Sequence, residues 1–133
     1  AVPVWRPLSR PARFGRLRPS TERWSGMSAE YLHIGIPVLN KKPNMVYNEW
    51  GGFWVNESVD EYDYKIEYLK FEEGTRFPEI LSKQPHVAYK VDDLDAYAED
   101  ADRVIFGPES LGEGVRLAFV VKDDAIIELY EEK

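Results

Sequence analysis

The chain has 133 residues, of which 44% are hydrophobic and 14% aromatic, and its formal net charge is −7. This length allows one domain and excludes two full ones, and the apolar share is that of a globular protein. The lack of cysteine excludes disulfide bonds, thiolate metal ligands and cysteine nucleophiles. No run of about 18 apolar residues occurs, so no membrane span is expected.

The first 26 residues differ from the rest in composition. They carry four of the nine prolines, and six arginines against the single acidic residue Glu22 give them a net charge of +5. Proline at this density disfavours a long helix or a central strand, and the apolar stretch of a signal peptide is missing. We therefore expect residues 1–26 to be an Arg/Pro-rich N-terminal extension without a catalytic part, held against the acidic body of its own chain or of a partner subunit.

The other 107 residues, 27–133, carry the remaining net charge of −12. Such a body is a poor partner for nucleic acid, because contacts with phosphates need a positive surface. It suits a metal ion or a cationic ligand instead, or simply keeps the protein in solution. We expect residues 27–133 to form one cytoplasmic domain that binds neither nucleic acid nor membrane.

In chain order, the pattern of residues 27–133 predicts short strands and one helix. Alternating apolar and aromatic residues predict a first strand over 31–38, closed by Asn40 and Pro43. Strands are then expected over 45–56 (one or two, with a bulge or turn at Gly51–Gly52), 63–72, 85–91, 103–106, 115–122 and 125–131. An acidic cap predicts the helix over 92–101, residues 74–84 are expected to be a connector, and a turn at Asp123–Asp124 joins the last two strands.

An internal repeat is present in these residues. The sequence HIGIPV beginning at His33 matches HVAYKV beginning at His86: a histidine, an apolar residue, a small residue, a bulky residue, any residue and a valine. Further on, IEYL with Glu67 matches IELY with Glu128, at distances of 34 and 42 residues from the respective histidine. Halves of about 50 residues are each too small to bury a sheet alone. We therefore expect them to pair around a pseudo-twofold axis that brings the two histidines and two glutamates together.

Two imidazoles and two carboxylates form a ligand set that suits Zn, Ni, Co, Fe(II) or Mn. Four protein ligands leave one or two positions open on a five- or six-coordinate ion, which is typical of a catalytic site. Glu67 shares its strand face with Leu69 and Phe71, where an unpaired carboxylate would be costly. Other interpretations stay open: an ordinary hydrogen-bonded strand histidine, a solvated Glu128 near the C-terminus, or three ligands with water in the fourth place.

These residues resemble the vicinal oxygen chelate superfamily, which includes glyoxalase-, bleomycin-resistance- and extradiol-dioxygenase-like proteins. The similarity covers about residues 30–132 and is closest in PHVAYKVDDLDAYAEDA and VRLAFVVKDDAIIELYEE, which resemble the second module of glyoxalase I-like proteins. YLHIGIPV and KIEYLKF match the first module. The resemblance implies an α+β fold in which paired βαβββ modules, about residues 30–73 and 85–132, form a curved mixed sheet. It places the four metal ligands of the family on His33, Glu67, His86 and Glu128.

The chain departs from this family after the first strand. The family has a helix there, whereas LNKKPNMVYNEW is short, contains Pro43 and runs quickly into strand-like sequence. We therefore expect the first-module helix to be reduced or absent, which puts one wall of the usual pocket in doubt. No set of basic residues resembles a glutathione site.

The resemblance also implies a function. In the superfamily a divalent metal ion binds two oxygens of a small substrate, and a second glutamate ligand is typical of isomerases, epimerases and lyases, where a metal-bound glutamate removes a proton next to a carbonyl. This implies a homodimeric metal-dependent isomerase or lyase for a small oxygen-rich metabolite, with Glu67 or Glu128 as the catalytic base.

Two alternatives belong to other classes of protein. The first is a non-catalytic binding protein of the bleomycin-resistance type, since an acidic and aromatic-rich body suits cationic aromatic drugs. Its candidate pocket residues are Tyr47, Trp50, Trp54 and Tyr64, although such aromatics are also ordinary core or interface residues. The second is a metal-free structural or regulatory module, in which the four polar residues would not converge.

Overall fold

The computed structural model describes residues 27–57 and 64–133, so the Arg/Pro-rich extension and its predicted contacts lie outside the described residues. The strands over these residues are β1 (Ala29–Pro37), β2 (Met45–Asn48), β3 (Phe53–Asn56), β4 (Ile66–Phe71), β5 (His86–Val91), β6 (Arg103–Gly112), β7 (Val115–Lys122) and β8 (Ala125–Glu132). They are accompanied by the α-helix α3 (Leu94–Asp100) and the 3-10 helix η4 (Glu79–Ser82).

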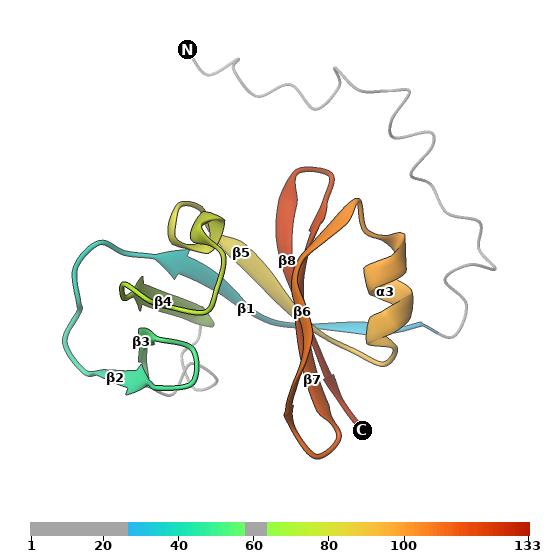
Figure 1. The fold of residues 1–133 in the computed structure, drawn as a ribbon, viewed down its shortest axis with the longest axis horizontal. Helices are drawn as coiled ribbons and strands as arrows, with labels where there is room; N and C mark the ends of the chain where they lie inside the picture. Colours follow the sequence, from blue (N-terminus) through green and yellow to red (C-terminus); the bar gives the residue numbers. More distant parts are fainter. Residues whose placement is uncertain (1–26, 58–63) are drawn as a thin grey trace, which may run out of the picture.

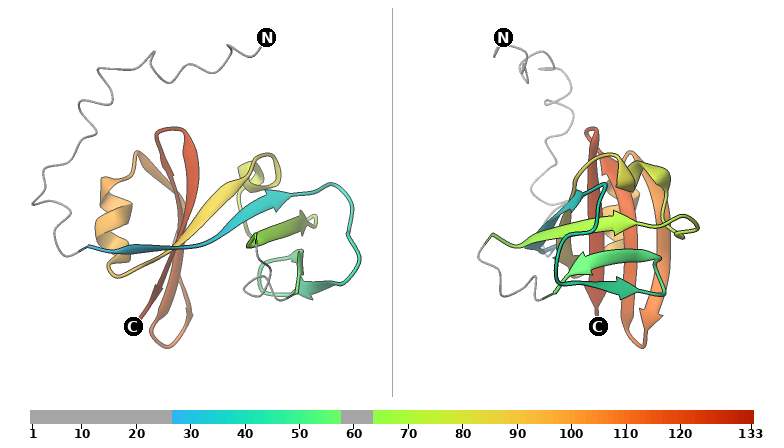
Figure 2. Two further views of the ribbon diagram at one scale, coloured as in Figure 1. Left: turned by 180° about the vertical axis from the view of Figure 1, so that it is seen from behind. Right: turned by 90° about the vertical axis from the view of Figure 1, so that its left-hand side faces the viewer.

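All eight strands belong to one mixed sheet with the order β2-β3-β4-β1-β5-β8-β7-β6. β1 is parallel to β4 and β5 is parallel to β8, whereas β1 and β5 meet antiparallel at the centre. The two halves of this order correspond strand by strand, so a pseudo-twofold axis runs between β1 and β5. Figures 1 and 2 show that the sheet curls into a half-barrel. The predicted α+β class, with paired modules and a curved mixed sheet, is confirmed.

In the second half, β5–β8, the outer face of the sheet is covered by α3. Asp93 caps this helix by accepting a hydrogen bond from the backbone N–H of Ala96 at 3.1 Å. Leu94 is fully buried against four sheet residues, which are Val91, Ala118, Val120 and Leu129. Among the described residues, no helix is long and apolar enough to cross a bilayer.

In the first half, β1–β4, residues 38–44 connect β1 directly to β2 without a helix, as the sequence predicts. Two lysines of this connector lie over aromatic rings of the outer face. Lys41 Nζ is 3.7 Å from the centre of the Trp54 ring, and Lys42 Nζ is 4.8 Å from the centre of the Tyr68 ring. The connector therefore covers the face that a helix covers in the second half.

The predicted strand positions agree with the structure except at β6, which continues to Gly112 instead of ending at Phe106. Gly107 and Pro108 look like strand breakers in the sequence. β6 is an edge strand, however, and its pairing with β7 shifts register between Phe106 and Glu109. An edge position and a bulge both tolerate proline, so the strand resumes after it.

Candidate metal centre

The register of the sheet brings the four predicted ligands together at the axis between the two halves. Gly35 of β1 lies opposite Glu67 of β4 on one side and opposite His86 of β5 on the other. A Cβ atom on Gly35 would overlap the imidazole ring of His86. The small residue of the first repeat therefore leaves room for the histidine of the second.

The same arrangement is found in the other half. Ala88 of β5, the small residue of the second repeat, lies opposite His33 of β1 and opposite Glu128 of β8. Ala88 is completely buried. Each half thus supplies a histidine, a glutamate and a small residue that leaves room for the histidine of the other half. This packing explains why the repeat contains a small residue two positions after each histidine.

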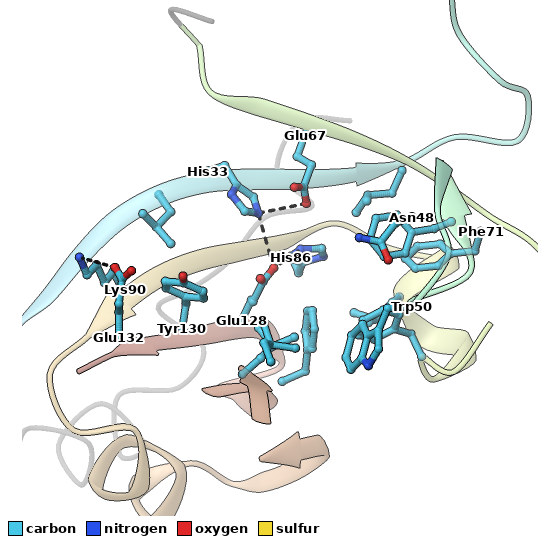
Figure 3. A pocket seen from close by; sticks show the side chains of 18 of the residues that line it. His33, Asn48, Trp50, Glu67, Phe71, His86, Lys90, Glu128, Tyr130 and Glu132 are labelled. Carbon is cyan, nitrogen blue, oxygen red and sulfur yellow. Dashed lines mark hydrogen bonds and ion pairs between the residues drawn. The ribbon is translucent and has the colours of Figure 1, made fainter. Parts of the chain in front are cut away.

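The ligand atoms of the four side chains lie within 4.8 Å of one another. Figure 3 shows the four side chains pointing toward the same place. Glu128 Oε1 is 3.0 Å from His86 Nε2 and 3.5 Å from His33 Nε2, and Glu67 Oε1 is 3.1 Å from His33 Nε2. Neighbouring ligands at about 2.1 Å from an ion are about 3.0–3.4 Å apart when they subtend about 90–110° at it. These separations fit ligands that share one divalent ion.

The electrostatics also fit a cation. Burial opposes charge on His33, but the carboxylates of Glu128 and Glu67 outweigh it and raise the pKa of His33 to about 10. Burial likewise opposes charge on Glu128, but His33 and His86 outweigh it and lower the pKa of that carboxyl group to about 2. His33 Nε2 is buried and has no well-aligned hydrogen bond. The two carboxylates thus favour positive charge between them, where the Nε2 atoms of His33 and His86 also lie.

The four side chains line a cavity of about 960 Å³ on the inner face of the curled sheet. Its other lining residues are Leu32, Asn48, Trp50, Phe53, Leu69, Phe71, Phe77, Leu81, Lys90, Ser110, Leu111, Leu117, Phe119, Tyr130 and Glu132. This volume suits a small organic ligand, and apolar walls with a few polar groups are usual for such sites. The ligand cluster is therefore open to a molecule that enters the cavity.

Of the four aromatics predicted for a substrate pocket, Trp50 lines this cavity and the other three do not. Trp54 pairs with Lys70 and lies on the outer face, with its ring 5.0 Å from that of Tyr47. Tyr64 precedes β4 and is 72% exposed. The sequence places Trp54 in a strand, but the face toward which it points depends on the pairing of that strand.

Several lining residues were not foreseen from the sequence. Phe77 and Leu81 come from the segment predicted as a plain connector, and Asn48 and Lys90 carried no distinguishing pattern. One signal was available for Tyr130 and Glu132, which follow Glu128 at alternate positions and so share its face. For the others, only the curl of the sheet decides that they meet the site.

The comparison with known proteins finds a similarity in fold but no match in sequence. No protein-family profile and no curated protein matches this chain in sequence. A similar solved structure is that of a hypothetical protein from Bacillus halodurans C-125, which is 20% identical. The match has a TM-score of 0.52 and covers 80% of this chain and 96% of that one. At this identity the similarity supports the fold, and the chemistry has to be argued from the site itself.

Proposed function

We propose that this protein is a metal-dependent isomerase or lyase that acts on a small oxygen-rich metabolite, with the two substrate oxygens bound at a centre formed by His33, Glu67, His86 and Glu128. The observation that carries this proposal is the convergence of four ligand atoms within 4.8 Å on the wall of a cavity. A site meant only to support the fold would be closed to solvent. Here the Glu67 side chain is still 21% exposed, so a ligand can approach it.

A divalent ion bound at this centre supplies Lewis-acid stabilisation of negative charge that develops on the substrate oxygens. The residues of the chain hold that ion, orient the substrate in the cavity and move the proton. Because the reaction class requires removal of a proton next to a carbonyl, one side chain has to act as a base within reach of the bound substrate.

Glu67 is the stronger candidate for the base. Its carboxylate approaches one histidine, His33, at 3.1 Å, whereas the Glu128 carboxylate lies between both histidines at 3.0 and 3.5 Å. Glu128 is thus held from two sides and its side chain is 15% exposed, compared with 21% for Glu67. We assign Glu128 to holding the centre together and Glu67 to accepting the proton from substrate.

A second candidate function is binding of a small molecule without chemistry. The observation that favours it is the aromatic wall of the cavity, which includes Trp50, Phe53, Phe71 and Phe77. Together with the net charge of −12 over residues 27–133, such a wall would attract a cationic aromatic compound. This function does not require two carboxylates beside two histidines.

The first experiment measures metal content in protein purified without chelator and without a histidine tag. We expect about one Zn, Ni, Co, Fe or Mn per chain, and its loss in His86→Ala. Glu132→Gln is the matched control, because this carboxylate lines the same cavity but lies outside the ligand cluster. Protein that is free of metal and whose melting temperature ignores added divalent ions would contradict the proposal.

The second experiment separates the roles of the glutamates by following exchange of the substrate proton with D2O, using 2-oxoaldehydes and 2-hydroxy acids as trial substrates. Glu67→Gln should retain the metal and lose about 10²–10⁴-fold in exchange rate, the usual contribution of a general base. Glu128→Gln should lose metal affinity first. Exchange that is absent in the metal-loaded native protein, together with tight binding of a cationic aromatic compound, would favour the binding function.

A further inference from the structure

The cavity has two chemically different ends, with the candidate metal centre between them. Figure 3 shows Asn48, Trp50 and Phe71 on one side of the centre, and Lys90, Tyr130 and Glu132 on the other. The first side is the aromatic end. Because a chelated ligand is fixed at the centre, any further group on it has to extend toward one of these two ends.

The aromatic end is a continuous wall of rings that reaches the centre. Trp50 stands edge-on to Phe77 at a centroid distance of 5.7 Å, and Phe77 to Phe119 at 5.6 Å. Phe119 in turn stands edge-on to the ligand His86 at 5.1 Å. An apolar group attached to a chelated head would therefore meet aromatic surface from the first atom outward.

Trp50 is the part of this wall that is open to a ligand. Trp50 is 36% exposed to solvent, whereas Phe77 is 9% and Phe119 is 4% exposed. Arg76 fixes the position of Trp50, because its guanidinium lies 4.2 Å from the centre of the Trp50 ring and its Nε donates to the Trp50 carbonyl at 2.7 Å. A ligand that covers Trp50 thus buries apolar surface on a residue that is already held in place.

The opposite end offers no free positive charge. Lys90 is the one lysine or arginine among the cavity residues of the described chain, and its Nζ pairs with Glu132 Oε1 at 3.2 Å. Glu67 and Glu128 add negative charge at the centre. A phosphate or other strongly anionic arm would therefore find no unpaired cation at this end of the cavity. At the aromatic end, the Arg76 guanidinium is stacked on the Trp50 ring and does not line the cavity.

Asn48 supplies a neutral hydrogen-bond donor at the aromatic end. The backbone N–H of Gly51 donates to Asn48 Oδ1 at 2.7 Å, and because that N–H is a donor, the atom facing it has to be the oxygen. The NH2 group of Asn48 is then turned away from Gly51, and in Figure 3 it faces the side of the cavity on which His86 lies. A carbonyl or hydroxyl oxygen of a ligand is a suitable acceptor for it.

We propose that the substrate of this site is a molecule with two adjacent oxygens, which chelate the metal ion, and an aromatic or branched apolar arm, which lies against Trp50 and Phe77. The arm carries no charge, so a phosphorylated metabolite is not the substrate. Asn48 donates a hydrogen bond to an oxygen at the base of this arm. The inference rests on the proposed function, because that function provides the bound chelating head.

The test uses three probes that share one chelating head and differ in their arm, which are acetohydroxamate, benzohydroxamate and phosphonoacetohydroxamate. Their affinities are measured by calorimetry with the full chain loaded with the metal found in the purified protein. We expect benzohydroxamate to bind about 10-fold tighter than acetohydroxamate or better, since a phenyl ring buries more apolar area than a methyl group. Phosphonoacetohydroxamate should bind more weakly than acetohydroxamate.

Variants of Trp50 test whether the aromatic wall causes the preference for benzohydroxamate. Trp50→Ala should reduce the ratio of the benzohydroxamate and acetohydroxamate affinities several-fold, because it removes more contact with the phenyl ring than with the methyl group. Tyr47→Ala, which removes an exposed aromatic outside the cavity, should retain the native ratio. Trp50→Gln repeats the test with a longer side chain if thermal melting shows that the alanine variant does not fold.

The outcomes distinguish this inference from the proposed function. If acetohydroxamate does not bind the metal-loaded protein, the chelation function fails and this inference fails with it. If acetohydroxamate binds but the phenyl arm gives no preference, or the preference persists in both Trp50 variants, only the inference is overturned. Tighter binding of the phosphonate probe would also overturn it.

Discussion

The two halves of the sheet contribute the same ligands to the site but are stabilised in different ways. In the second half, α3 packs Leu94 into an apolar cluster on the outer face. In the first half, residues 38–44 take the place of a helix, and Lys41 and Lys42 lie over half-buried aromatic rings. The histidines and glutamates nevertheless occupy equivalent positions. The convergence of these four side chains therefore depends on strand register and does not require the same covering layer behind both halves.

The comparison extends to the burial of the ligands. His86 of the second half has a side-chain exposure of 2%, whereas His33 of the first half has 12%. Glu67 of the first half is likewise more exposed than Glu128 of the second. The second half thus supplies the more deeply buried pair of side chains, and the first half supplies the more exposed glutamate that we assign to proton transfer.

The largest expected difference between the halves is in stability. Leu94→Ala should lower the free energy of unfolding by about 3 kcal/mol, because it leaves a cavity in the completely buried cluster under α3. Tyr47→Ala on the outer face of the first half, where the residue is 43% exposed, should cost less than about 1 kcal/mol. Urea denaturation of both variants measures this, and equal losses would show that the helix layer is not the main support.

The small residues at the axis should respond unequally to substitution. Gly35→Ala forces a Cβ atom into the ring of His86 and should cost about 2 kcal/mol and weaken metal binding. The reciprocal change Ala88→Gly removes a buried methyl group and should cost about 1 kcal/mol without displacing a ligand. Denaturation and metal titration of the two variants check this, and an unaltered metal affinity in Gly35→Ala would contradict the packing argument.

The attachment of α3 should make the second half sensitive to acid. Glu131 is 3% exposed and accepts hydrogen bonds from Arg116 Nε at 3.0 Å and from the N–H of Leu94 at 2.9 Å. The Arg116 hydrogen bond, followed by that of Leu94, lowers the pKa of Glu131 below its ordinary value of 4.5, against the opposing effect of burial. A lowered folded-state pKa means that this stabilisation is present above pH 4.5 and is lost as the pH falls below it.

Glu131→Gln tests this dependence, since glutamine cannot titrate. Between pH 6 and pH 3 the native protein should lose about 1 kcal/mol more stability than the variant. The measurement is the free energy of unfolding in urea across this pH range. Parallel pH profiles for the two proteins would show that Glu131 does not couple the helix to protonation.

The smallest expected effect concerns the connector of the first half. Lys41→Ala should lower stability by about 0.5 kcal/mol, because a cation over a half-buried indole ring at the surface contributes little. A double-mutant cycle with Trp54→Leu isolates the contact from other effects of the lysine. An interaction energy of zero would mean that the connector covers this face without stabilising it.

Much of the fold could be predicted from the sequence because the signals are local. Alternation of apolar and polar residues located the strands, and the acidic cap predicted the start of α3. The structure identifies this cap as Asp93, which accepts a hydrogen bond from the Ala96 N–H. The short, proline-containing segment after β1 indicated that a helix was missing. The extension of β6 past Pro108 was not foreseen, because an edge position is a property of the sheet and not of the strand.

The sequence by itself determined which residues are candidates for the metal centre, because the repeat places the two histidines and two glutamates at equivalent positions. Only the tertiary structure decided the rest. Strand pairing puts Gly35 against His86 and turns Trp54 away from the cavity while Trp50 lines it. The face of the sheet toward which a side chain points, and the residues that lie beside it on neighbouring strands, depend on register and curvature. Both arise from contacts between residues far apart in the chain.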